Sequence, residues 1–171
     1  AIDIPDYIKA ELLDLQPMES PEVSLVATNN MHLTLLYIGN GDIDAVQKTL
    51  QSFTMPSFEL NLTDIGHFSA RKSTVLWAGL NRPDALMELH EKLNQQLSPV
   101  LSDKNIKPYS PHITLARCSD ATSYEMIQAY LTQHCDLAGG EFKVSGFSLY
   151  SSHQSKGGTY YKKQNYYPFE L

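Results

Sequence analysis

The sequence predicts an α+β fold, in which helices and strands mix without strict alternation. Segments with one apolar face at helical spacing are interspersed with short apolar segments typical of strands. Two strand segments, 58–62 and 73–80, follow one another as a hairpin, which disfavours a doubly wound parallel sheet. The pattern His-x-Thr-Leu occurs twice, in MHLTLLYIG and SPHITLAR. The repetition predicts one domain, residues 1–171, made of two related lobes that each contribute one motif.

The expected helices begin at residues suited to a helix start and have one apolar face. They cover residues 5–16, 42–53, 83–101, and a segment that starts at Ser119 or Asp120 with Tyr124, Ile127, Tyr130 and Leu131 turned inward.

The remaining strands are expected over residues 31–38, around His112 and over 141–150, and residues 160–171 are expected to form a last strand or a tail. In 141–150 the apolar positions change from even to odd numbers at Gly146, which predicts a β-bulge. Residues 152–159, SHQSKGGT, are expected to form a flexible loop.

Composition narrows the function classes. The chain is 42% hydrophobic and 19% charged, which is ordinary for a globular protein. Its net charge of −6 disfavours binding to long nucleic acid through many phosphates. Any contact with RNA should therefore be local, at an end or a single nucleotide.

The segments that would direct a protein to a membrane or out of the cell, together with the cysteine pattern, lead us to expect a cytoplasmic location. No apolar run is long enough for a membrane span, and no signal segment opens the chain. The cysteines, Cys118 and Cys135, form neither a metal spacing nor a disulfide framework, so a reducing compartment is expected. The opening AIDIP resembles the middle of a strand, and we expect residues to precede Ala1.

Each motif places two polar side chains on one face of a strand. Residues two apart in a strand point to the same side, so His32 and Thr34 point together, as do His112 and Thr114. The apolar residues between them point to the opposite face. An unpaired buried polar group costs about 1–3 kcal/mol, so the polar face must meet water, a partner or a ligand.

A cleft that holds both motifs would suit phosphoryl chemistry without a metal. One neutral imidazole removes a proton from the attacking oxygen, and the other, protonated, gives one to the leaving oxygen. An unperturbed pKa of about 6.5 makes both states available, and a bell-shaped pH profile is expected. We therefore expect His32 and His112 to be catalytic, with either as the acid, and Thr34 and Thr114 to bind the phosphate oxygens.

The orientation of Arg117 depends on the regularity of its strand. It lies three residues after Thr114, so in a regular strand it would point to the opposite face. A strand end or bulge near Ala116 would return the guanidinium to the cleft, where it could bind a phosphate. The local pattern leaves both orientations open.

Other candidates near the motifs have weaker support. Tyr109 is a candidate for stacking on an unpaired base. Trp77 is expected in the core, and His90 on the solvated side of a helix. A zinc site formed by both motif histidines and Cys118 is disfavoured, because structural zinc needs four closely spaced ligands and the threonines would be unexplained.

The paired motifs resemble those of the two-histidine (2H) phosphoesterase superfamily. Within it, the chain is similar to the bacterial RNA 2′,3′-cyclic phosphodiesterases, also called 2′-5′ RNA ligases. The likeness extends over nearly the whole chain: AIDIP resembles the first strand, WAGL the middle hairpin and FSLYSS a late strand. The aromatic residues that often precede AID in this family and help hold the base are absent, and the segment SHQSKGGTYYKKQN is particular to this chain.

The resemblance implies a bilobal fold with pseudo-two-fold symmetry, antiparallel sheets lining a central cleft and helices outside. It implies hydrolysis of a 2′,3′-cyclic phosphate at an RNA or nucleotide end to a 2′-phosphate, without metal or cofactor. His32, His112, Thr34 and Thr114 match the family's phosphate site, and Arg117 matches the basic residue after the second motif. A monomer is expected, because one chain supplies both motifs.

Three alternatives stay open at this stage. The domain could be a sensor that binds a nucleotide without rapid turnover. The same chemistry could act on 2′-5′ oligoadenylate or on the cyclic phosphate of ADP-ribose. Reversible 2′-5′ RNA ligation could take place in the same cleft.

Overall fold

The computed structural model describes residues 1–70, 72–101, 108–155 and 158–170. The helices in this part of the chain are α1 (Asp6–Asp14), α2 (Ile43–Leu50), α3 (Asp84–Leu97), α4 (Tyr124–Gln133) and the short 3₁₀ helix η1 (Thr28–Asn30). The strands are β1 (Ile2–Asp3), β2 (Val23–Leu25), β3 (His32–Leu33), β4 (Phe58–Ala70), β5 (Ser73–Leu80), β6 (His112–Ser119), β7 (Glu141–Val144), β8 (Gly146–Ser155) and β9 (Gly158–Pro168). All strand pairs are antiparallel, which confirms the predicted α+β class.

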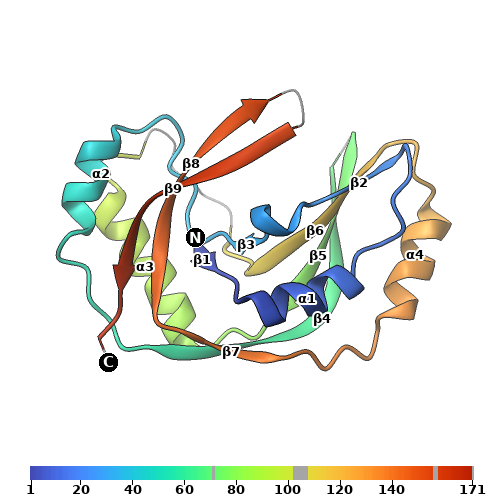
Figure 1. The fold of residues 1–171 in the computed structure, drawn as a ribbon, viewed down its shortest axis with the longest axis horizontal. Helices are drawn as coiled ribbons and strands as arrows, with labels where there is room; N and C mark the ends of the chain where they lie inside the picture. The colour runs from blue at the N-terminus through green and yellow to red at the C-terminus, as the bar shows by residue number, and fades with distance from the viewer. Residues whose placement is uncertain (71, 102–107, 156–157, 171) are drawn as a thin grey trace.

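Most strands join one large sheet. Its order is β1-β3-β6-β5-β4-β7, and β2 pairs with β6 beyond the end of β3. The hairpin of β8 and β9 forms a second, two-stranded sheet. In Figure 1 this hairpin and the hairpin of β4 and β5 rise toward the same side of the molecule. The two motif strands, β3 and β6, are neighbours in the large sheet.

The helices lie at the periphery (Figure 1). α2 and α3 lie together at one end of the molecule, and α4 lies at the other. Two helices have side-chain caps: Asp42 accepts from the backbone of α2, and Ser123 accepts from Met126 N of α4. Across the described residues, no helix combines the length and apolar character needed to cross a bilayer.

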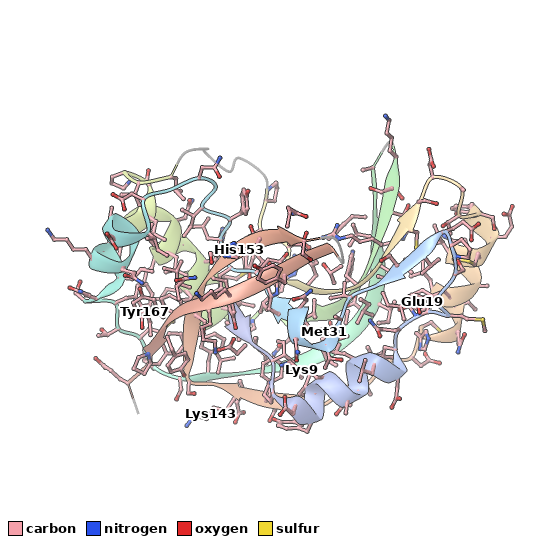
Figure 2. All side chains as sticks on the ribbon, turned by 45° about the horizontal axis from the view of Figure 1, so that its top comes forward. Lys9, Glu19, Met31, Lys143, His153 and Tyr167 are labelled. Atoms are coloured by element: carbon pink, nitrogen blue, oxygen red, sulfur yellow. The ribbon has the colours of Figure 1, made fainter. Side chains whose placement is uncertain are left out.

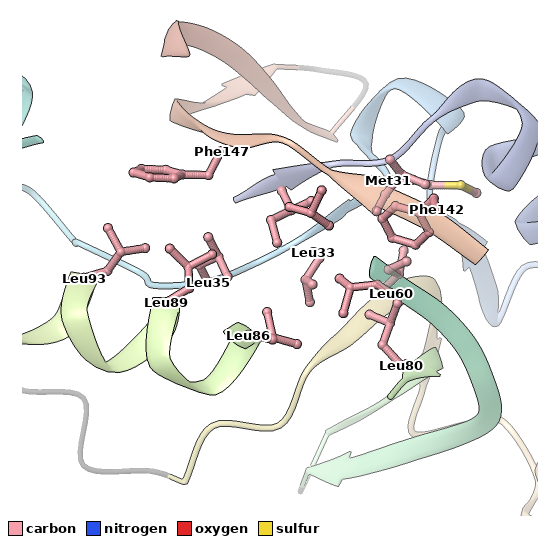
Figure 3. Close-up of a cluster of buried hydrophobic side chains, with 14 of the residues drawn as sticks. Met31, Leu33, Leu35, Leu60, Leu80, Leu86, Leu89, Leu93, Phe142 and Phe147 are labelled. Atoms are coloured by element: carbon pink, nitrogen blue, oxygen red, sulfur yellow. The ribbon is translucent and has the colours of Figure 1, made fainter. Parts of the chain in front are cut away.

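The main core packs α3 against the motif strand and the sheet. Figure 3 shows the leucines of α3 facing Leu33 and Leu35, with Phe142 and Phe147 nearby. Leu33 is fully buried, and so is Ile113 opposite it. A smaller apolar cluster under α4 contains Val23, Leu76, Ala116, Cys118, Ile127 and Tyr130. The apolar sides of both motifs are thus anchored in the main core.

The strand predicted over residues 31–38 is wrong beyond Leu33, where β3 ends. The carbonyl oxygens of Thr34 and Leu35, which follow β3, accept hydrogen bonds from side chains and not from the backbone of a neighbouring strand. Tyr109 donates from its hydroxyl to Thr34 O at 3.2 Å, and His90 donates from Nδ1 to Leu35 O at 2.8 Å. The prediction that His90 is solvated is therefore also wrong. These donors come from distant segments, which local periodicity does not report.

The single strand predicted over residues 141–150 is also wrong. The chain changes sheets at Ser145: β7 pairs with β4, and β8 pairs with β9. The parity change at Gly146 therefore marks a crossing between sheets and not a bulge. Gly146 lies where a Cβ atom would collide with the Tyr166 ring and hydroxyl, which explains the glycine.

Two further expectations need correction. The loop predicted over 152–159 is mostly the arms of the β8–β9 hairpin, and residues 156–157 lie outside the described part. His153, labelled in Figure 2, lies on the β8 arm and stacks on Tyr160. The fourth helix begins after Ser123, later than predicted, because β6 continues to Ser119. Tyr124 is accordingly 68% exposed, and not inward as expected.

Candidate active site

The two motifs meet across one antiparallel pair. Leu33 of β3 lies opposite Ile113 of β6, and both point into the core. The residues on either side point to the other face. In this register His32 lies opposite Thr114, and Thr34 lies opposite His112. The four polar side chains thus share one face, related by a local two-fold axis through the central pair.

Hydrogen bonds fix the tautomer of each neutral histidine. Nδ1 of His32 lies 2.7 Å from Asn30 O, and Nδ1 of His112 lies 2.7 Å from Ser110 O. A carbonyl oxygen only accepts, so each Nδ1 must be the donor. Nε2 of each ring is the nitrogen left for a substrate, as a lone pair when the ring is neutral and as an N–H when it is protonated.

The surroundings of His32 lower the pKa of its ring. Desolvation lowers the pKa of His32 below 6.5, because burial disfavours the charged ring. The hydrogen bond to Asn30 O and the charge of Asp3 oppose this effect. His112 contributes to the lowering by charge repulsion, so the two rings interact electrostatically.

A β-bulge in β6 orients Arg117. Leu76 pairs with Ala116, whereas the next residue, Trp77, pairs with Thr114, so β6 has one extra residue. Val75 and Trp77 share a face of β5, and their partners are Arg117 and Thr114. Arg117 therefore lies on the same face as the second motif, and its side chain is exposed. The structure brings together all five predicted phosphate-site residues.

Aromatic rings flank both histidines in the same way. The ring centroid of Tyr161 lies 4.7 Å from that of His32, edge to face, and Tyr150 lies 6.1 Å away. The ring of Phe68 lies 4.9 Å from His112, also edge to face, and Trp77 lies 6.3 Å away. Each hairpin thus supplies one ring from each of its two strands. The prediction that Trp77 belongs to the core is wrong, because Trp77 is only half-buried and its ring lies against Phe68 and His112 on the site face of β5.

Asp3 lies directly opposite His32 in the β1–β3 pair. Its carboxylate accepts hydrogen bonds from Tyr150 Oη, from Ser148 Oγ at 2.7 Å, and from Lys163 Nζ at 2.7 Å. Burial raises the pKa of Asp3, but the bonds from Lys163, Tyr150 and Ser148 outweigh it, so the pKa is held below its usual value. The ionised Asp3 thereby ties the β8–β9 hairpin to the first motif.

Tyr109 supports the first motif in this structure. Its ring stacks on His90 with centroids 4.0 Å apart and planes 6° apart, and its hydroxyl donates to Thr34 O. Burial raises the pKa of Tyr109, so the hydroxyl stays protonated as a donor. One ring face is therefore occupied by His90. These contacts therefore do not favour the base-stacking role predicted for Tyr109.

A cavity of about 560 Å³ opens beside His32. One wall is the segment 34–41, which follows the first motif, and the others come from α2, α3 and the β8–β9 hairpin. Thr34, Tyr150 and Tyr161 also line it. A volume of this size is typical of small-molecule sites. It provides space for a nucleoside next to the first histidine.

No metal ligand set is assembled among the described residues: nowhere do three His, Cys, Asp or Glu side chains gather. Cys118 is buried in the apolar cluster under α4, one residue after Arg117 and therefore on the opposite face of β6. It cannot share a ligand set with the motif histidines.

Comparison with known proteins then identifies the family. A family model described as the 2′-5′ RNA ligase superfamily matches residues 5–156. The chain belongs to this superfamily. The match contains both His-x-Thr motifs and Arg117, and it confirms the family predicted from the motifs.

Individual members of the superfamily resemble the chain over most of its length. An RNA 2′,3′-cyclic phosphodiesterase of Escherichia coli is 29% identical over 167 residues, which are 94% of this chain and 89% of that protein. One of Methanocaldococcus jannaschii is 27% identical over 165 residues, 95% and 94% of the two chains. The crystal structure of E. coli LigT complexed with 3′-AMP aligns with a TM-score of 0.79 and 25% identity, over 99% of this chain and 95% of that one. These likenesses confirm the predicted fold.

Several site residues of this superfamily member were not predicted from the sequence. Asp3, Phe68 and Tyr161 reach the site through strand pairings that join segments far apart in the chain. A partial signal exists for Asp3, which is a charged residue between buried isoleucines in AIDIP. Phe68 and Tyr161 have no comparable local pattern.

Proposed function

We propose that this chain is a phosphodiesterase that hydrolyses the 2′,3′-cyclic phosphate at the end of an RNA or of a nucleotide, leaving a 2′-phosphate. The observation that supports this most directly is the pairing of the two motifs across Leu33 and Ile113, with both Nε2 atoms left for the substrate. The names of the E. coli and M. jannaschii relatives agree with it.

The arrangement supports in-line displacement at phosphorus. Water attacks on one side of the phosphorus while the P–O3′ bond breaks on the other, so a base and an acid are needed on opposite sides. His32 and His112 are diagonal neighbours across the central pair, and such neighbours in a sheet lie about 7–8 Å apart. One Nε2 accepts the proton of the water, and the other donates its proton to O3′.

The threonines and the arginine have a separate role in this proposal. The non-bridging phosphate oxygens keep their negative charge through the transition state. The hydroxyls of Thr34 and Thr114 donate to these oxygens, and the Arg117 guanidinium neutralises their charge. Every step is assigned to a side chain of the protein, and we propose that no metal is required.

Product analysis tests this proposal. Adenosine 2′,3′-cyclic phosphate and a short RNA with the same end are incubated with the protein in EDTA and ¹⁸O-labelled water. We expect adenosine 2′-phosphate and an RNA 2′-phosphate end, each with one ¹⁸O atom. A 3′-phosphate product, or activity that EDTA abolishes, would contradict the mechanism. Tight nucleotide binding without turnover would support the alternative of a sensor.

A further inference from the structure

The aromatic rings beside the two histidines are held in different ways. Trp77, beside His112, lies on β5, which pairs directly with the strand of the second motif. Tyr150 and Tyr161, beside His32, lie on the β8–β9 hairpin, which is a separate two-stranded sheet. A hairpin of two strands is only marginally stable without further packing. Contacts with the rest of the molecule must therefore fix the rings next to His32.

The core holds only the base of this hairpin. Phe147 and Tyr167 are buried there. Farther along β8, the side chains of residues 152–155 are exposed. Tyr161 lies opposite this exposed stretch, and its own side chain is half-buried, with the ring edge to face on His32 and the centroids 4.7 Å apart. The core therefore does not by itself explain why the Tyr161 ring stays at the histidine.

Two hydrogen bonds join β9 to the segments around the first motif, one on each side of Tyr161. Asn30 donates from Nδ2 to Thr159 O at 2.9 Å, two residues before the tyrosine. Lys163, two residues after it, donates from Nζ to the Asp3 carboxylate at 2.7 Å. The two bonds thus bracket the ring along the strand.

Both bonds end at residues that also adjoin His32. The carbonyl oxygen of Asn30 accepts from Nδ1 of the imidazole at 2.7 Å. Asp3 lies directly opposite His32 in the β1–β3 pair. The position of β9 and the orientation of the His32 ring are therefore coupled through Asn30 and Asp3.

We propose that Asn30 and Lys163 are positioning residues for His32. They hold β9 at two points, so the Tyr161 ring stays against the imidazole and restricts its rotation. Nε2 then keeps the direction that proton transfer requires. The kinetic consequence of this inference rests on the proposed function, whereas the ring geometry can be measured without any substrate.

The contact between Lys163 and Asp3 is suited to a test by substitution. Both side chains are partly exposed, and an ion pair of this kind contributes little to stability. Its removal should leave the protein folded and release mainly the arm of the hairpin. Lys163→Met removes the charge and keeps most of the length of the side chain, and Lys163→Arg keeps the charge.

NMR of the His32 ring protons tests the geometry. An aromatic ring held edge to face shifts the resonances of nearby protons, and Tyr161→Leu shows the complete loss of this shift. Lys163→Met and Asn30→Ala should each move the His32 resonances towards the values in Tyr161→Leu. Lys162→Met is the matched control, because Lys162 is the neighbouring residue and its side chain points to the opposite face of β9. It should leave the resonances unchanged.

Kinetics with adenosine 2′,3′-cyclic phosphate tests the consequence. We expect kcat to fall about tenfold in Lys163→Met, because a misplaced imidazole transfers its proton less well. Lys163→Arg should retain most of the wild-type kcat, and Lys162→Met all of it. If Lys163 acts through the Tyr161 ring, Lys163→Met should have little further effect in the Tyr161→Leu background.

Three results would overturn the inference. One is unchanged His32 resonances in both Lys163→Met and Asn30→Ala, whatever the activity. Another is a raised KM in Lys163→Met with kcat and the resonances unchanged, because Lys163 would then bind the substrate directly. The third is additive losses of kcat in Lys163→Met and Tyr161→Leu. A wild type that does not hydrolyse the cyclic phosphate would instead refute the proposed function, and the resonances would still decide the positioning role.

Discussion

The carbonyl oxygens of Asn30 and Ser110 decide which nitrogen of each histidine faces the substrate. Both lie two residues before their histidine, so each motif carries its own orienting group in the local backbone. The sequence pattern predicted the histidines and threonines because this geometry is local. It did not predict Asp3 or Phe68, because their positions depend on pairings between distant strands.

The two threonine hydroxyls should act in the transition state. Thr34→Val and Thr114→Val keep the side-chain shape and remove one donor each. We expect kcat for cyclic phosphate hydrolysis to fall about 10²–10³-fold in each variant, as for loss of one oxyanion donor. Thr132→Val on α4 is the control, because it removes a hydroxyl that donates to the Gln128 carbonyl within the same helix. A fall of less than twofold in both motif variants would rule out this role.

Burial of His32 should make stability depend on pH. Its pKa is lowered in the folded state from 6.5, so below that value the unfolded chain binds more protons at this residue. The contribution of neutral His32 is therefore fully present above about pH 6.5 and is lost as the pH falls. The free energy of unfolding in urea should fall more steeply on acidification in wild type than in His32→Gln. Parallel pH curves for the two proteins would contradict this.

At the scale of elements, two side chains hydrogen-bond to the backbone after the first motif, where a neighbouring strand would otherwise do so. β3 has only two residues, and the stacked pair of His90 and Tyr109 binds the carbonyl oxygens of Leu35 and Thr34. Tyr109 also lies next to Ser110, whose carbonyl orients His112. The pair therefore connects the backbone after one motif to the backbone before the other.

Tyr109→Phe tests this connection. It keeps the ring stack and removes the hydroxyl bond to Thr34 O, so Thr34 should be misplaced and kcat should fall about tenfold. If Tyr109 acts through Thr34, the same change should have little further effect in the Thr34→Val background. Tyr130→Phe is the matched control, since its hydroxyl donates to Leu15 O at 2.7 Å away from the site. Additive effects of Tyr109→Phe and Thr34→Val would contradict a positioning role.

The β4–β5 hairpin requires a glycine beneath Trp77. Gly66 pairs with Trp77, and a Cβ atom at this position would collide with the indole ring. Gly66→Ala should therefore displace the ring and lower the free energy of unfolding by about 1–3 kcal/mol, the usual cost of overpacking. Urea unfolding monitored by tryptophan fluorescence measures both effects, since Trp77 is the single tryptophan. Unchanged stability and spectrum would show that the ring has room to move.

Helix and strand types were predicted better than their limits. The leucine spacing of α3 and the alternation in β4 and β5 are strong local signals, and the structure confirms them. The sheet change at Ser145 and the end of β3 at Leu33 depend on which distant segments supply hydrogen-bond partners. The orientation of Arg117 depends on a bulge that is visible only in the β5–β6 register.

At the scale of the whole molecule, the chain assembles one site from both ends and the middle. β1 supplies Asp3, the β4–β5 hairpin supplies Phe68 and Trp77, and the β8–β9 hairpin supplies Tyr150 and Tyr161. The repeated motif predicted two related halves, and the shared face of β3 and β6 agrees with it. The two lobes, the monomeric state and the cytoplasmic location stay predictions.

The most direct test of the account is the rate of cyclic phosphate hydrolysis in His32→Ala, His112→Ala and the double variant. Each single change should lower kcat about 10²–10⁴-fold, the usual contribution of a general acid or base, with circular dichroism unchanged. The double variant should be little slower than either single one, because the base and the acid act as a unit in the same reaction and the loss of either one already removes their joint effect. Retention of near wild-type kcat in either single variant would contradict the two-histidine mechanism.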